Sequence, residues 1–336
     1  MNGESRSAQM RRFIGADGMP YIIAEIGFNH EGDMGAAKKM IAAAAATGAD
    51  AVKFQTYRAS DLALPSSPHF KAIACGEMGF KQHAELARTA KTHRVDFLST
   101  PYSVWAVDLL EKIGVPLYKI ASMDLTNIEL LRHAAKTGKP LLISTGMASL
   151  PEIRKTVAML RRMKSGPVTM LHCLSKYPAC PEDINLAFMD TISRECRCPV
   201  GYSDHMIGTH ACLAAAVLGA SVIEKHFTLD STKRGADHYH SADPIQLRKL
   251  IEDIRLVIKI VGSKDRSRRA DRADAIRFRR GVYAAVDIPT GQQIRREHLV
   301  CCRPEAEFSP SDIDKIVGCA ARINIAANSP IMSKHI

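Results

Sequence analysis

The chain has 336 residues, of which 46 are Lys or Arg and 35 are Asp or Glu, so its formal net charge is +11. Hydrophobic residues make up 46% and charged residues 24% of the sequence, which is typical of soluble globular proteins and excludes a wholly disordered, collagen-like or coiled-coil chain. No apolar run approaches the ~18 residues that a membrane span needs, and the first twenty residues contain no continuous apolar core. We therefore expect a cytoplasmic protein that does not associate with membranes.

Much of the positive charge is concentrated in one segment near the C-terminal end. Residues 255–280 contain ten basic and three acidic residues, which supply seven of the eleven net charges. A single basic stretch is more often a solvated linker than a nucleic-acid groove, and a nucleic-acid groove would give a DNA affinity with a steep salt dependence. We therefore expect no nucleic-acid partner.

From Tyr21 onward, short β-rich runs alternate with amphipathic helical patterns. Strands are predicted at Tyr21–Ile26, Ala51–Phe54, Asp96–Ser99, Leu117–Ile120, Leu141–Ser144, Val168–His172, Val200–Tyr202 and Val222–Lys225. Helices are predicted at Asp33–Thr47, Lys81–His93, Ser103–Ile113, Asn127–Thr137, Leu150–Met163, Ile184–Arg194, Thr209–Leu218 and Pro244–Val261. Eight alternating units predict an α/β protein with a (β/α)8 TIM barrel, because a doubly wound sheet rarely needs so many regular repeats.

The pattern changes after Val261 into a polar, basic stretch followed by short β-like runs and the turn Pro289-Thr290-Gly291-Gln292. We expect an N-terminal extension at 1–20, a barrel domain at 21–262, a basic linker at 263–278 and a small β-rich domain at 279–336. A domain of this size is marginally stable alone, so we expect it to pack on another surface.

Polar side chains stand at the carboxyl end of every predicted strand. In a barrel these ends meet on one face, which is where active sites lie. In chain order they are Glu25 with Asn29 and His30, Lys53 with Gln55, Thr100, Lys119 with Ser122, Ser144 with Thr145, His172 with Ser175 and Tyr177, Ser203 with Asp204 and His205, and Glu224 with His226. This face is the predicted site.

Lys53 and Lys119 each lie within an otherwise apolar strand. A buried lysine is costly unless an anion pairs with it, and two interpretations stay open. The lysines can form a cradle for phosphate and carboxylate groups, or they can make structural ion pairs, for instance with Glu25 or Glu224. The cradle would be completed by hydroxyl groups at Ser122, Ser144 and Ser203. The position of the lysines at strand ends favours the ligand.

His205 and His226 end the seventh and eighth strands, which are neighbours in a barrel. Their imidazoles can therefore approach one divalent ion such as Mn²⁺, Zn²⁺ or Fe²⁺ and leave coordination positions open for water and substrate. The alternative is that each is a hydrogen-bonded barrel histidine. Glu25, Asp237 and Glu224 can supply a further ligand, a base, or orientation of a histidine.

Other chemistries have weaker support. His238 and His240 alternate in GADHYHS (235–241), and we expect such loop histidines at the surface. Cys173 and Cys180 have no base at a recognisable spacing, and the nine cysteines form no CxxC pair. The sequence contains no GxGxxG or Walker A segment, which argues against a dinucleotide-binding fold or an NTPase.

The strand-end motifs together resemble one enzyme family, the N-acetylneuraminate (sialic acid) synthases and related nonulosonic acid synthases. The motifs are IIAEIGFNHEGD (22–33), GADAVKFQTY (48–57), FLSTPY (97–102), YKIAS (118–122), LLISTGMAS (141–149), LHCLSKYP (171–178), GYSDHMIG (201–208), EKHFTLD (224–230) and GADHYHS (235–241). RRGVYAAVDIPTGQQI (279–294) and CCRP (301–304) resemble the small SAF, or antifreeze-like, domain of these enzymes.

The resemblance implies that phosphoenolpyruvate (PEP) condenses with N-acetylmannosamine or a related acetamido sugar and water, which gives a nonulosonic (sialic) acid and phosphate. It implies PEP-binding roles for Lys53, Thr100, Lys119, Ser122, Ser144, Ser175 and Ser203. It implies sugar contacts from Gln55, Tyr177, Asp237 and Arg303, and a divalent metal, Mn²⁺, on His205 and His226. Glu25, His205, His226 and Asp237 would be the catalytic residues. Either Glu25 or the metal would activate the water, and the position of Glu25 at the end of the first strand motivates the hypothesis that Glu25 is the base.

The resemblance also implies a domain-swapped homodimer in which Arg303 of one subunit reaches the N-acetyl group in the partner's barrel. A close alternative is a legionaminic or pseudaminic acid synthase that acts on a 2,4-diacetamido-6-deoxy sugar. An alternative of another class is a non-catalytic sugar-binding or polysaccharide-assembly protein. The chain departs from the usual motifs at Leu174, Ser175, Gly281 and residues 305–308, so the sugar contacts and the surroundings of Arg303 can differ.

Overall fold

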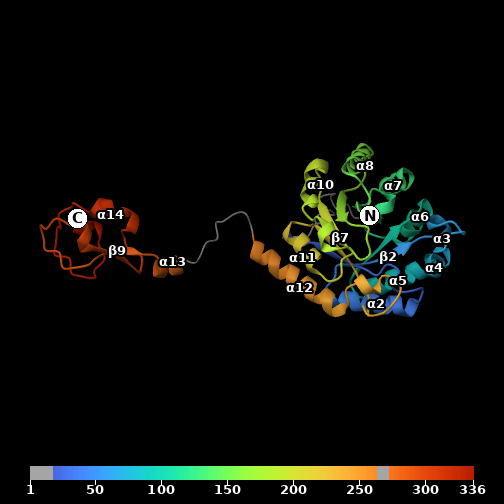
Figure 1. The fold of residues 1–336 in the computed structure, drawn as a ribbon, viewed down its shortest axis with the longest axis horizontal. Helices are drawn as coiled ribbons and strands as arrows, with labels where there is room; N and C mark the ends of the chain where they lie inside the picture. Colours follow the sequence, from blue (N-terminus) through green and yellow to red (C-terminus); the bar gives the residue numbers. More distant parts are fainter. Residues whose placement is uncertain (1–17, 263–271) are drawn as a thin grey trace. The chain divides into compact units, whose positions relative to one another are not determined.

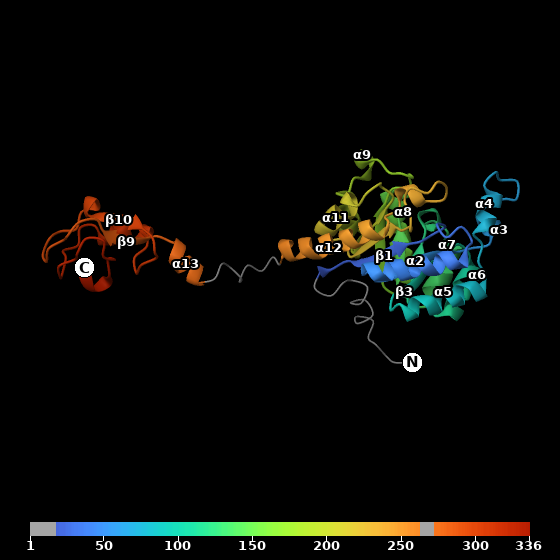
Figure 2. The ribbon, with the colours of Figure 1, turned by 90° about the horizontal axis from the view of Figure 1, so that it is seen from below.

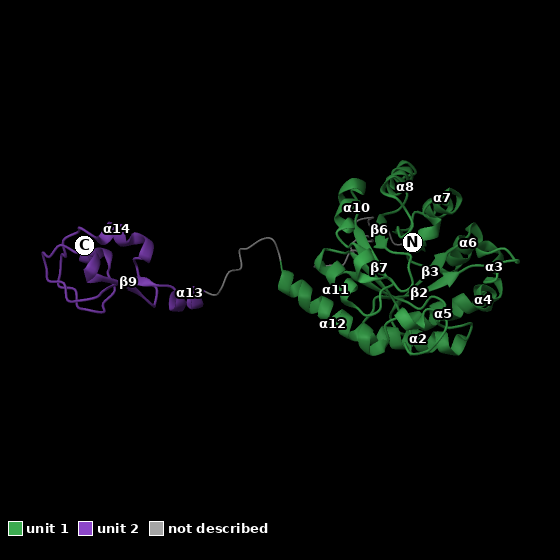
Figure 3. Ribbon diagram, viewed as in Figure 1, with its two compact units in different colours: residues 1–262 green, residues 263–336 purple. Residues whose placement is uncertain are grey.

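The computed structural model describes residues 18–262 and 272–336. The chain divides into two compact units, residues 1–262 and 263–336, which are coloured separately in Figure 3. Residues 1–17 of the expected N-terminal extension and 263–271 of the expected linker lie outside the described residues.

The first unit contains eight parallel strands arranged in a barrel (Figure 1). They are β1 (Tyr21–Glu25), β2 (Ala51–Thr56), β3 (Asp96–Pro101), β4 (Tyr118–Ile120), β5 (Leu141–Ser144), β6 (Val168–Cys173), β7 (Val200–Asp204) and β8 (Val222–His226). The order is β3-β2-β1-β8-β7-β6-β5-β4, and β3 and β4 lie in contact at the remaining seam. The first and last strands pair in register from Tyr21–Val222 to Glu25–His226. The predicted (β/α)8 architecture is therefore confirmed.

Helices cover the outside of the barrel. They are α2 (Met34–Thr47), α3 (Ala59–Leu62), α4 (Phe70–Cys75), α5 (Phe80–Thr92), α6 (Val104–Ile113), α7 (Ile128–Lys136), α8 (Leu150–Arg162), α9 (Pro181–Ile184), α10 (Phe188–Cys196), α11 (His210–Val217) and α12 (Pro244–Val261). The last helix, α12, packs against α11 and α2 and so completes the outer ring (Figure 2). The helix expected at Ile184–Arg194 begins only at Phe188, because Asn185 ends the short preceding helix α9 with a left-handed backbone, φ 47°.

Local sequence explains where these helices begin and end. Before α2, the Asp33 carboxylate accepts hydrogen bonds from the backbone N–H groups of Gly35 and Ala36. The same helix ends at Gly48, whose φ of 91° is one that a side chain disfavours. None of the helices in the described part of the chain is long and apolar enough to cross a membrane.

Apolar side chains form two layers in the barrel unit. A large outer core fills the space between the sheet and the helices. A smaller inner core fills the lower half of the barrel with Tyr21, Ile23, Ala51, Leu98, Leu117, Leu142, Leu171 and Val222. Because alternate residues of a strand face the same side, Glu25 after Ile23 and Lys53 after Ala51 must face into the upper half of the barrel.

The second unit is small and has its own core. Helix α13 (Arg272–Phe278) lies within the segment expected as a linker, and an antiparallel pair follows, β9 (Gly281–Ala284) with β10 (Leu299–Cys302). One further helix is α14 (Ile313–Ile316). The buried core comprises Val282, Ala284, Ile288, Ile294, Leu299, Ile316, Ala321, Ile325 and Ile331.

Candidate functional site

A pocket of about 220 Å³ opens among the carboxyl ends of the barrel strands. It is lined by every barrel residue to which the family resemblance gives a role: Glu25, Lys53, Gln55, Thr100, Lys119, Ser122, Ser144, Ser175, Tyr177, Ser203, His205, His226 and Asp237. Of the other residues at the predicted strand ends, Asn29, His30, Thr145, His172 and Asp204 do not line it. Side chains from all eight βα units thus meet in one place, at the end of the barrel where catalysis occurs in this fold.

The pocket follows from the alternation within each strand. Ile23 of the inner apolar core is followed two residues later by Glu25, and Ala51 is followed in the same way by Lys53. The same offset relates the remaining pairs, which are Leu98 and Thr100, Leu117 and Lys119, Leu142 and Ser144, and Val222 and Glu224. The lower apolar layer therefore forms the floor beneath the polar layer.

Two lysines and two glutamates form a buried charge cluster in this pocket. Lys53 Nζ lies 2.7 Å from Glu25 Oε2 and 3.6 Å from Glu224 Oε1. Lys119 Nζ lies 3.2 Å from the same Glu224 oxygen. Both interpretations of the lysines thus have support, since the ion pairs exist and the same side chains line the pocket. The ion pairs hold both lysines in the wall of the pocket.

The two glutamates have different ionisation behaviour. Burial, together with the nearby Glu224 charge, raises the pKa of Glu25 to about 7 despite the attraction of Lys53. Burial also opposes ionisation of Glu224, but Lys119 and Lys53 outweigh it and lower the pKa of that carboxyl. Glu25 can therefore exchange a proton near neutral pH while Glu224 stays ionised as the partner of both lysines.

Hydroxyl groups surround the lysines. Lys53 Nζ donates to Thr100 Oγ1 at 3.0 Å, and Ser203 Oγ donates to Glu224 Oε1 at 3.0 Å. The hydroxyls of Ser144 and Ser175 are buried and have no hydrogen-bond partner among the described residues. Buried hydroxyls are normally paired, so these two indicate a polar ligand in the pocket.

Gly146 allows the side chains of Ser122, Cys173 and Ser175 to lie close to one another. A Cβ atom on Gly146 would lie 2.5 Å from Ser175 Oγ, 2.7 Å from Cys173 Sγ and 3.1 Å from Ser122 Oγ. The backbone N–H of Gly146 also donates to Ser122 Oγ at 3.0 Å. Any side chain at this position would therefore displace the serine hydroxyls.

Histidines form the other side of the pocket. The ring centroids of His205 and His226 lie 5.3 Å apart, and those of His226 and His240 lie 4.8 Å apart. One potential ligand atom from each of His226, Asp237 and His240 lies within 4.8 Å of the other two. Asp237 Oδ2 is 3.6 Å from His226 Nδ1. The structure thus brings the predicted pair together and adds a third histidine.

The expectation that His238 and His240 lie at the surface is wrong, because each is only 1% exposed. Asn29, in the loop that follows β1, holds the loop of these histidines in place by hydrogen bonds. The Asn29 amide nitrogen donates to the Phe227 carbonyl at 3.0 Å and to Ser241 Oγ at 2.9 Å. Its oxygen accepts from the Asp237 N–H at 2.9 Å. This side chain therefore places Asp237 and His240 in the site.

The donor set suits a divalent metal ion. His226 Nδ1 and both ring nitrogens of His240 are buried without a hydrogen-bond partner in the described part of the chain. His205 Nδ1 lies 2.7 Å from the Leu174 carbonyl, which orients the ring in the manner common for metal-binding histidines. Burial lowers the pKa of His205, and it lowers that of His240 to about 4. These imidazoles are therefore neutral, which is the form that binds a metal.

Four lining residues are absent from the sequence prediction: Tyr102, Ala121, Met123 and Met147. Met123 and Met147 are 52% and 64% exposed. Tyr102, Ala121 and Met147 lie within the motifs FLSTPY, YKIAS and LLISTGMAS, and Met123 directly follows YKIAS, so a position in or beside a motif was the available signal.

The remaining predicted residue, Arg303, belongs to the second unit. It is exposed, and its guanidinium carbon lies 5.3 Å from the centre of the Phe278 ring within that unit. Its predicted sugar contact therefore stays a prediction.

Comparison with known families agrees with this geometry. The sequence model of the NeuB family matches residues 40–266, and that of the SAF domain matches residues 279–336. The chain belongs to the NeuB family. The predicted family, the predicted SAF domain and the expectation of an enzyme are thereby confirmed.

Two relatives match nearly the whole chain, and a solved structure matches most of it. The chain is 37% identical to an N,N'-diacetyllegionaminic acid synthase of Legionella pneumophila, with 94% of each sequence covered. It is 32% identical to the human N-acetylneuraminate-9-phosphate synthase, with 97% of this chain and 95% of that one covered. A crystal structure of the N-acetylneuraminic acid (sialic acid) synthetase from Leptospira borgpetersenii, in complex with citrate, is similar with a TM-score of 0.75. Its identity is 36%, and the match covers 78% of this chain and 92% of that one.

Proposed function

We propose that this NeuB-family chain condenses PEP with an N-acetylated amino sugar and water, and that it releases a nonulosonic acid and inorganic phosphate. The observation that carries this proposal is the pairing, in one pocket, of an anion cradle with a histidine and carboxylate cluster. Lys53, Lys119 and the unpartnered hydroxyls of Ser144 and Ser175 suit an anionic substrate. His205, His226, Asp237 and His240 suit a metal ion.

PEP would bind in the lower part of the pocket. Its phosphate and carboxylate groups would receive charge-assisted hydrogen bonds from Lys53 and Lys119. The serine and threonine hydroxyls supply further donors from Thr100, Ser122, Ser144, Ser175 and Ser203. Because the lysines are already held by Glu25 and Glu224, binding requires little rearrangement of the pocket.

The sugar would bind above PEP, beside the histidines. We propose that His205 and His226 hold a divalent ion, Mn²⁺ among the candidates, with Asp237 and His240 close enough to complete its surroundings. A bound ion of this kind supplies a Lewis acid for the aldehyde oxygen of the sugar. Gln55, Tyr177 and Asp237 line the same part of the pocket and would fix the sugar's orientation.

The bond changes follow from this placement. Carbon 3 of PEP forms a bond with the aldehyde carbon of the sugar, and water adds to carbon 2 as positive charge develops there. Glu25 accepts the proton from that water, for which its pKa of about 7 is suited. The aldehyde oxygen takes up a proton and becomes a hydroxyl group. The bond from carbon 2 to the phosphate oxygen then breaks as the new carbon 2 hydroxyl group loses its proton, which leaves the 2-keto acid and phosphate. Lys53 and Lys119 stabilise the negative charge throughout.

The acceptor sugar is N-acetylmannosamine or a 2,4-diacetamido-6-deoxy sugar of the legionaminic or pseudaminic acid type. The second possibility is favoured by the Legionella relative, which is named as an N,N'-diacetyllegionaminic acid synthase. We further propose a homodimer in which Arg303 contacts the N-acetyl group of the sugar in the partner's barrel.

Phosphate release tests the proposal directly. The purified chain with PEP and Mn²⁺ is incubated separately with N-acetylmannosamine and with the 2,4-diacetamido sugars, and phosphate and product mass are measured. Turnover with either sugar class supports the condensation and assigns the acceptor. No phosphate release with any of these sugars would contradict the proposed reaction and would instead support a sugar-binding protein without turnover.

A further inference from the structure

The candidate active-site pocket has one apolar wall. All but three of the residues that line it carry a charged group, a hydroxyl, an amide or an imidazole. The three exceptions are Ala121, Met123 and Met147, which follow β4 and β5 in the chain. The two methionines are about half and two-thirds exposed, so a molecule in the pocket can contact them without any change in the core.

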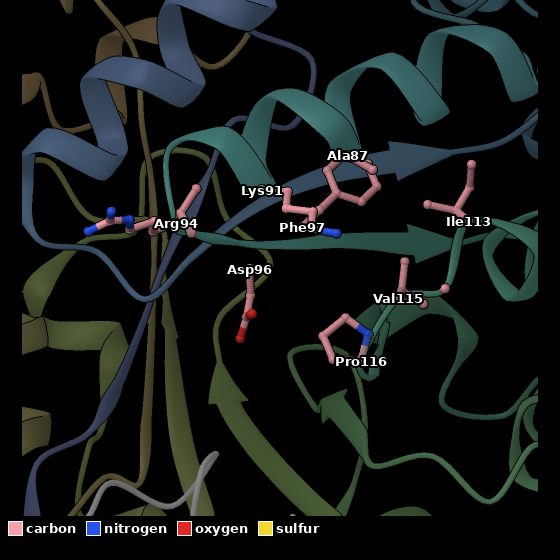
Figure 4. Close-up of a pocket in the computed structure, with 10 residues that line it drawn as sticks. Ala87, Lys91, Arg94, Asp96, Phe97, Ile113, Val115 and Pro116 are labelled. Atoms are coloured by element: carbon pink, nitrogen blue, oxygen red, sulfur yellow. The ribbon is translucent and has the colours of Figure 1, made fainter. Parts of the chain in front are cut away.

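A hollow at the other end of the barrel differs in this respect. Its volume is about 490 Å³, and it lies between the end of α5, the start of β3 and the connection from α6 to β4 (Figure 4). Its apolar residues Phe97 and Val115 are 7% and 2% exposed and belong to the outer core. They offer no surface to a ligand, whereas Met123 and Met147 do.

The two methionines come from turns that are joined by a hydrogen bond. Met123 directly follows Ser122 in a short 3₁₀ helix after β4. Met147 directly follows Gly146, and the Gly146 N–H donates to Ser122 Oγ at 3.0 Å. This bond keeps the two turns side by side, so both methionines belong to the same wall of the pocket.

The methionine wall stands across the barrel from the histidines. The strand order closes into a ring where β3 meets β4, so β8 is four strands away from β4 in either direction. His226 ends β8, and Met123 follows β4. Within the pocket, Lys119 of β4 lies 3.2 Å from Glu224 of β8, so the space between these opposite strands is narrow. One molecule in the pocket can therefore touch both sides.

The proposed condensation determines which end of the sugar meets which side. Carbon 1 of the sugar is the aldehyde carbon, and it has to lie beside the histidines and above PEP for the new bond to form. Carbon 6 is the other end of the carbon chain, so it extends toward the methionine wall. In N-acetylmannosamine carbon 6 carries a hydroxyl, and in a 6-deoxy sugar it is a methyl group.

We infer that Met123 and Met147 select an acceptor sugar whose carbon 6 is a methyl group. The methyl packs against the two methionine side chains, whereas a hydroxyl at the same place would give up hydrogen bonds to water without receiving one from this wall. The inference rests on the function proposed above, because it uses the position of the aldehyde carbon. It goes further by naming the residues that distinguish two classes of acceptor.

Two sugars that differ by one oxygen atom test this inference. They are N-acetylmannosamine and its 6-deoxy counterpart, 2-acetamido-2,6-dideoxymannose. We expect kcat/KM for phosphate release to be about tenfold higher with the 6-deoxy sugar. An apolar site discriminates against an added hydroxyl by about tenfold to a hundredfold, and this wall is partly exposed, which favours the lower value.

Variants of the wall connect the preference to the two methionines. In a Met123→Gln/Met147→Gln variant, whose side chains are polar and of similar length, the ratio of the two kcat/KM values should fall to about one. A Met123→Leu/Met147→Leu variant stays apolar and should keep the preference. Leu64→Gln is the matched control, because Leu64 is exposed and follows β2 and α3 but does not line the pocket. It should keep the wild-type ratio.

Binding separates this inference from the proposed reaction. Isothermal titration calorimetry with Mn²⁺ and PEP present gives the affinity for each sugar if neither one is turned over. Absence of phosphate release would contradict the reaction, while tighter binding of the 6-deoxy sugar to the wild type than to the glutamine variant would still support the methionine contact. The inference is overturned if the wild type shows no preference in turnover or, without turnover, in binding. It is equally overturned if the glutamine variant, with an unchanged melting temperature, keeps the preference.

Discussion

Asp204 and Lys225 form an ion pair of 2.7 Å between neighbouring strands β7 and β8, and neither side chain has any exposed surface. Asp204 also accepts hydrogen bonds from the Tyr202 hydroxyl at 2.8 Å and from the Met206 N–H at 3.1 Å. Lys225 donates to the Met206 carbonyl. The next residues along the chain are His205 and His226. This network therefore fixes, from outside the barrel, the two strand ends that carry the predicted metal ligands.

Replacing one partner of this pair should destabilise the barrel strongly. Lys225→Met leaves the Asp204 carboxylate buried without its counterion, and we expect a loss of about 3–5 kcal/mol in the free energy of unfolding. Urea denaturation measures this change in the free energy of unfolding. The Asp204→Leu/Lys225→Met double variant removes both charges and should recover part of the loss. A single variant as stable as the wild type would show that the pair does not hold these strands.

Glu25→Gln should slow turnover by about a hundredfold, because loss of a general base typically costs at least that factor. The substitution keeps the size of the side chain and removes its ability to accept a proton. The measurement is kcat for phosphate release with PEP and the active sugar. Glu31→Gln, in the loop that follows β1 and outside the pocket, is the matched control and should keep the wild-type rate. A Glu25→Gln rate within about twofold of wild type would exclude Glu25 as the base.

The pH dependence of catalysis should follow Glu25. Burial raises its pKa to about 7, and the base must be deprotonated to accept a proton from water. The rate should therefore fall as the pH is lowered through about 7, by tenfold for each further pH unit, and reach a plateau above it. A kcat/KM profile for PEP measures this limb. The limb should be missing from the residual activity of Glu25→Gln, and its persistence there would assign it to another group.

His240 should contribute to metal affinity. Chelation should abolish activity and Mn²⁺ should restore it, and His240→Ala should raise the Mn²⁺ concentration needed for half-restoration by about 10–100-fold. His238→Ala is the matched control, because His238 is equally buried but contacts Thr228 rather than the cluster. Full activity of the chelated wild-type enzyme would contradict the metal site, and equal behaviour of both variants would remove His240 from it.

Arg303→Ala should weaken binding of the sugar and leave binding of PEP unchanged. If Arg303 contacts the N-acetyl group, the variant should raise KM for the sugar about tenfold, the usual cost of a hydrogen bond from a charged group, and leave KM for PEP unchanged. Arg322→Ala, another exposed arginine of the second unit, serves as the control. Steady-state kinetics with each substrate varied in turn provides the measurement. Equal changes in both KM values would indicate that Arg303 does not reach the sugar.

The strands could be predicted from the sequence because the first half of each is apolar. The residues at which the strands end were harder to predict. The prediction stopped the second strand at Phe54, whereas β2 continues through Gln55 and Thr56. The seventh continues likewise through Ser203 and Asp204. In most sheets a polar residue signals a turn, but the upper interior of this barrel holds polar side chains in a functional pocket. The strands therefore extend into the residues that carry the chemistry.

The burial of His240 could not be derived from its own neighbourhood in the sequence. Its loop reads as polar and exposed, and it is buried because of a hydrogen bond between Asp237 and Asn29, which are 208 residues apart. By contrast, Lys53 and Lys119 could be assigned from local sequence because a charge within an apolar strand is conspicuous. Local patterns thus located the two lysines of the pocket, while the position of the third histidine depended on a tertiary contact.

The hydrogen bond between Asn29 and Asp237 affects the order in which the site forms as the chain folds. Asn29 comes from the first βα unit, and the loop it holds follows the last strand, so Asp237 and His240 reach their places only once β1 has paired with β8. An incompletely folded chain, or one still emerging from the ribosome, lacks this closure and cannot bring the histidines and Asp237 together. If this cluster holds the proposed divalent ion, the ion would bind only after the barrel has closed.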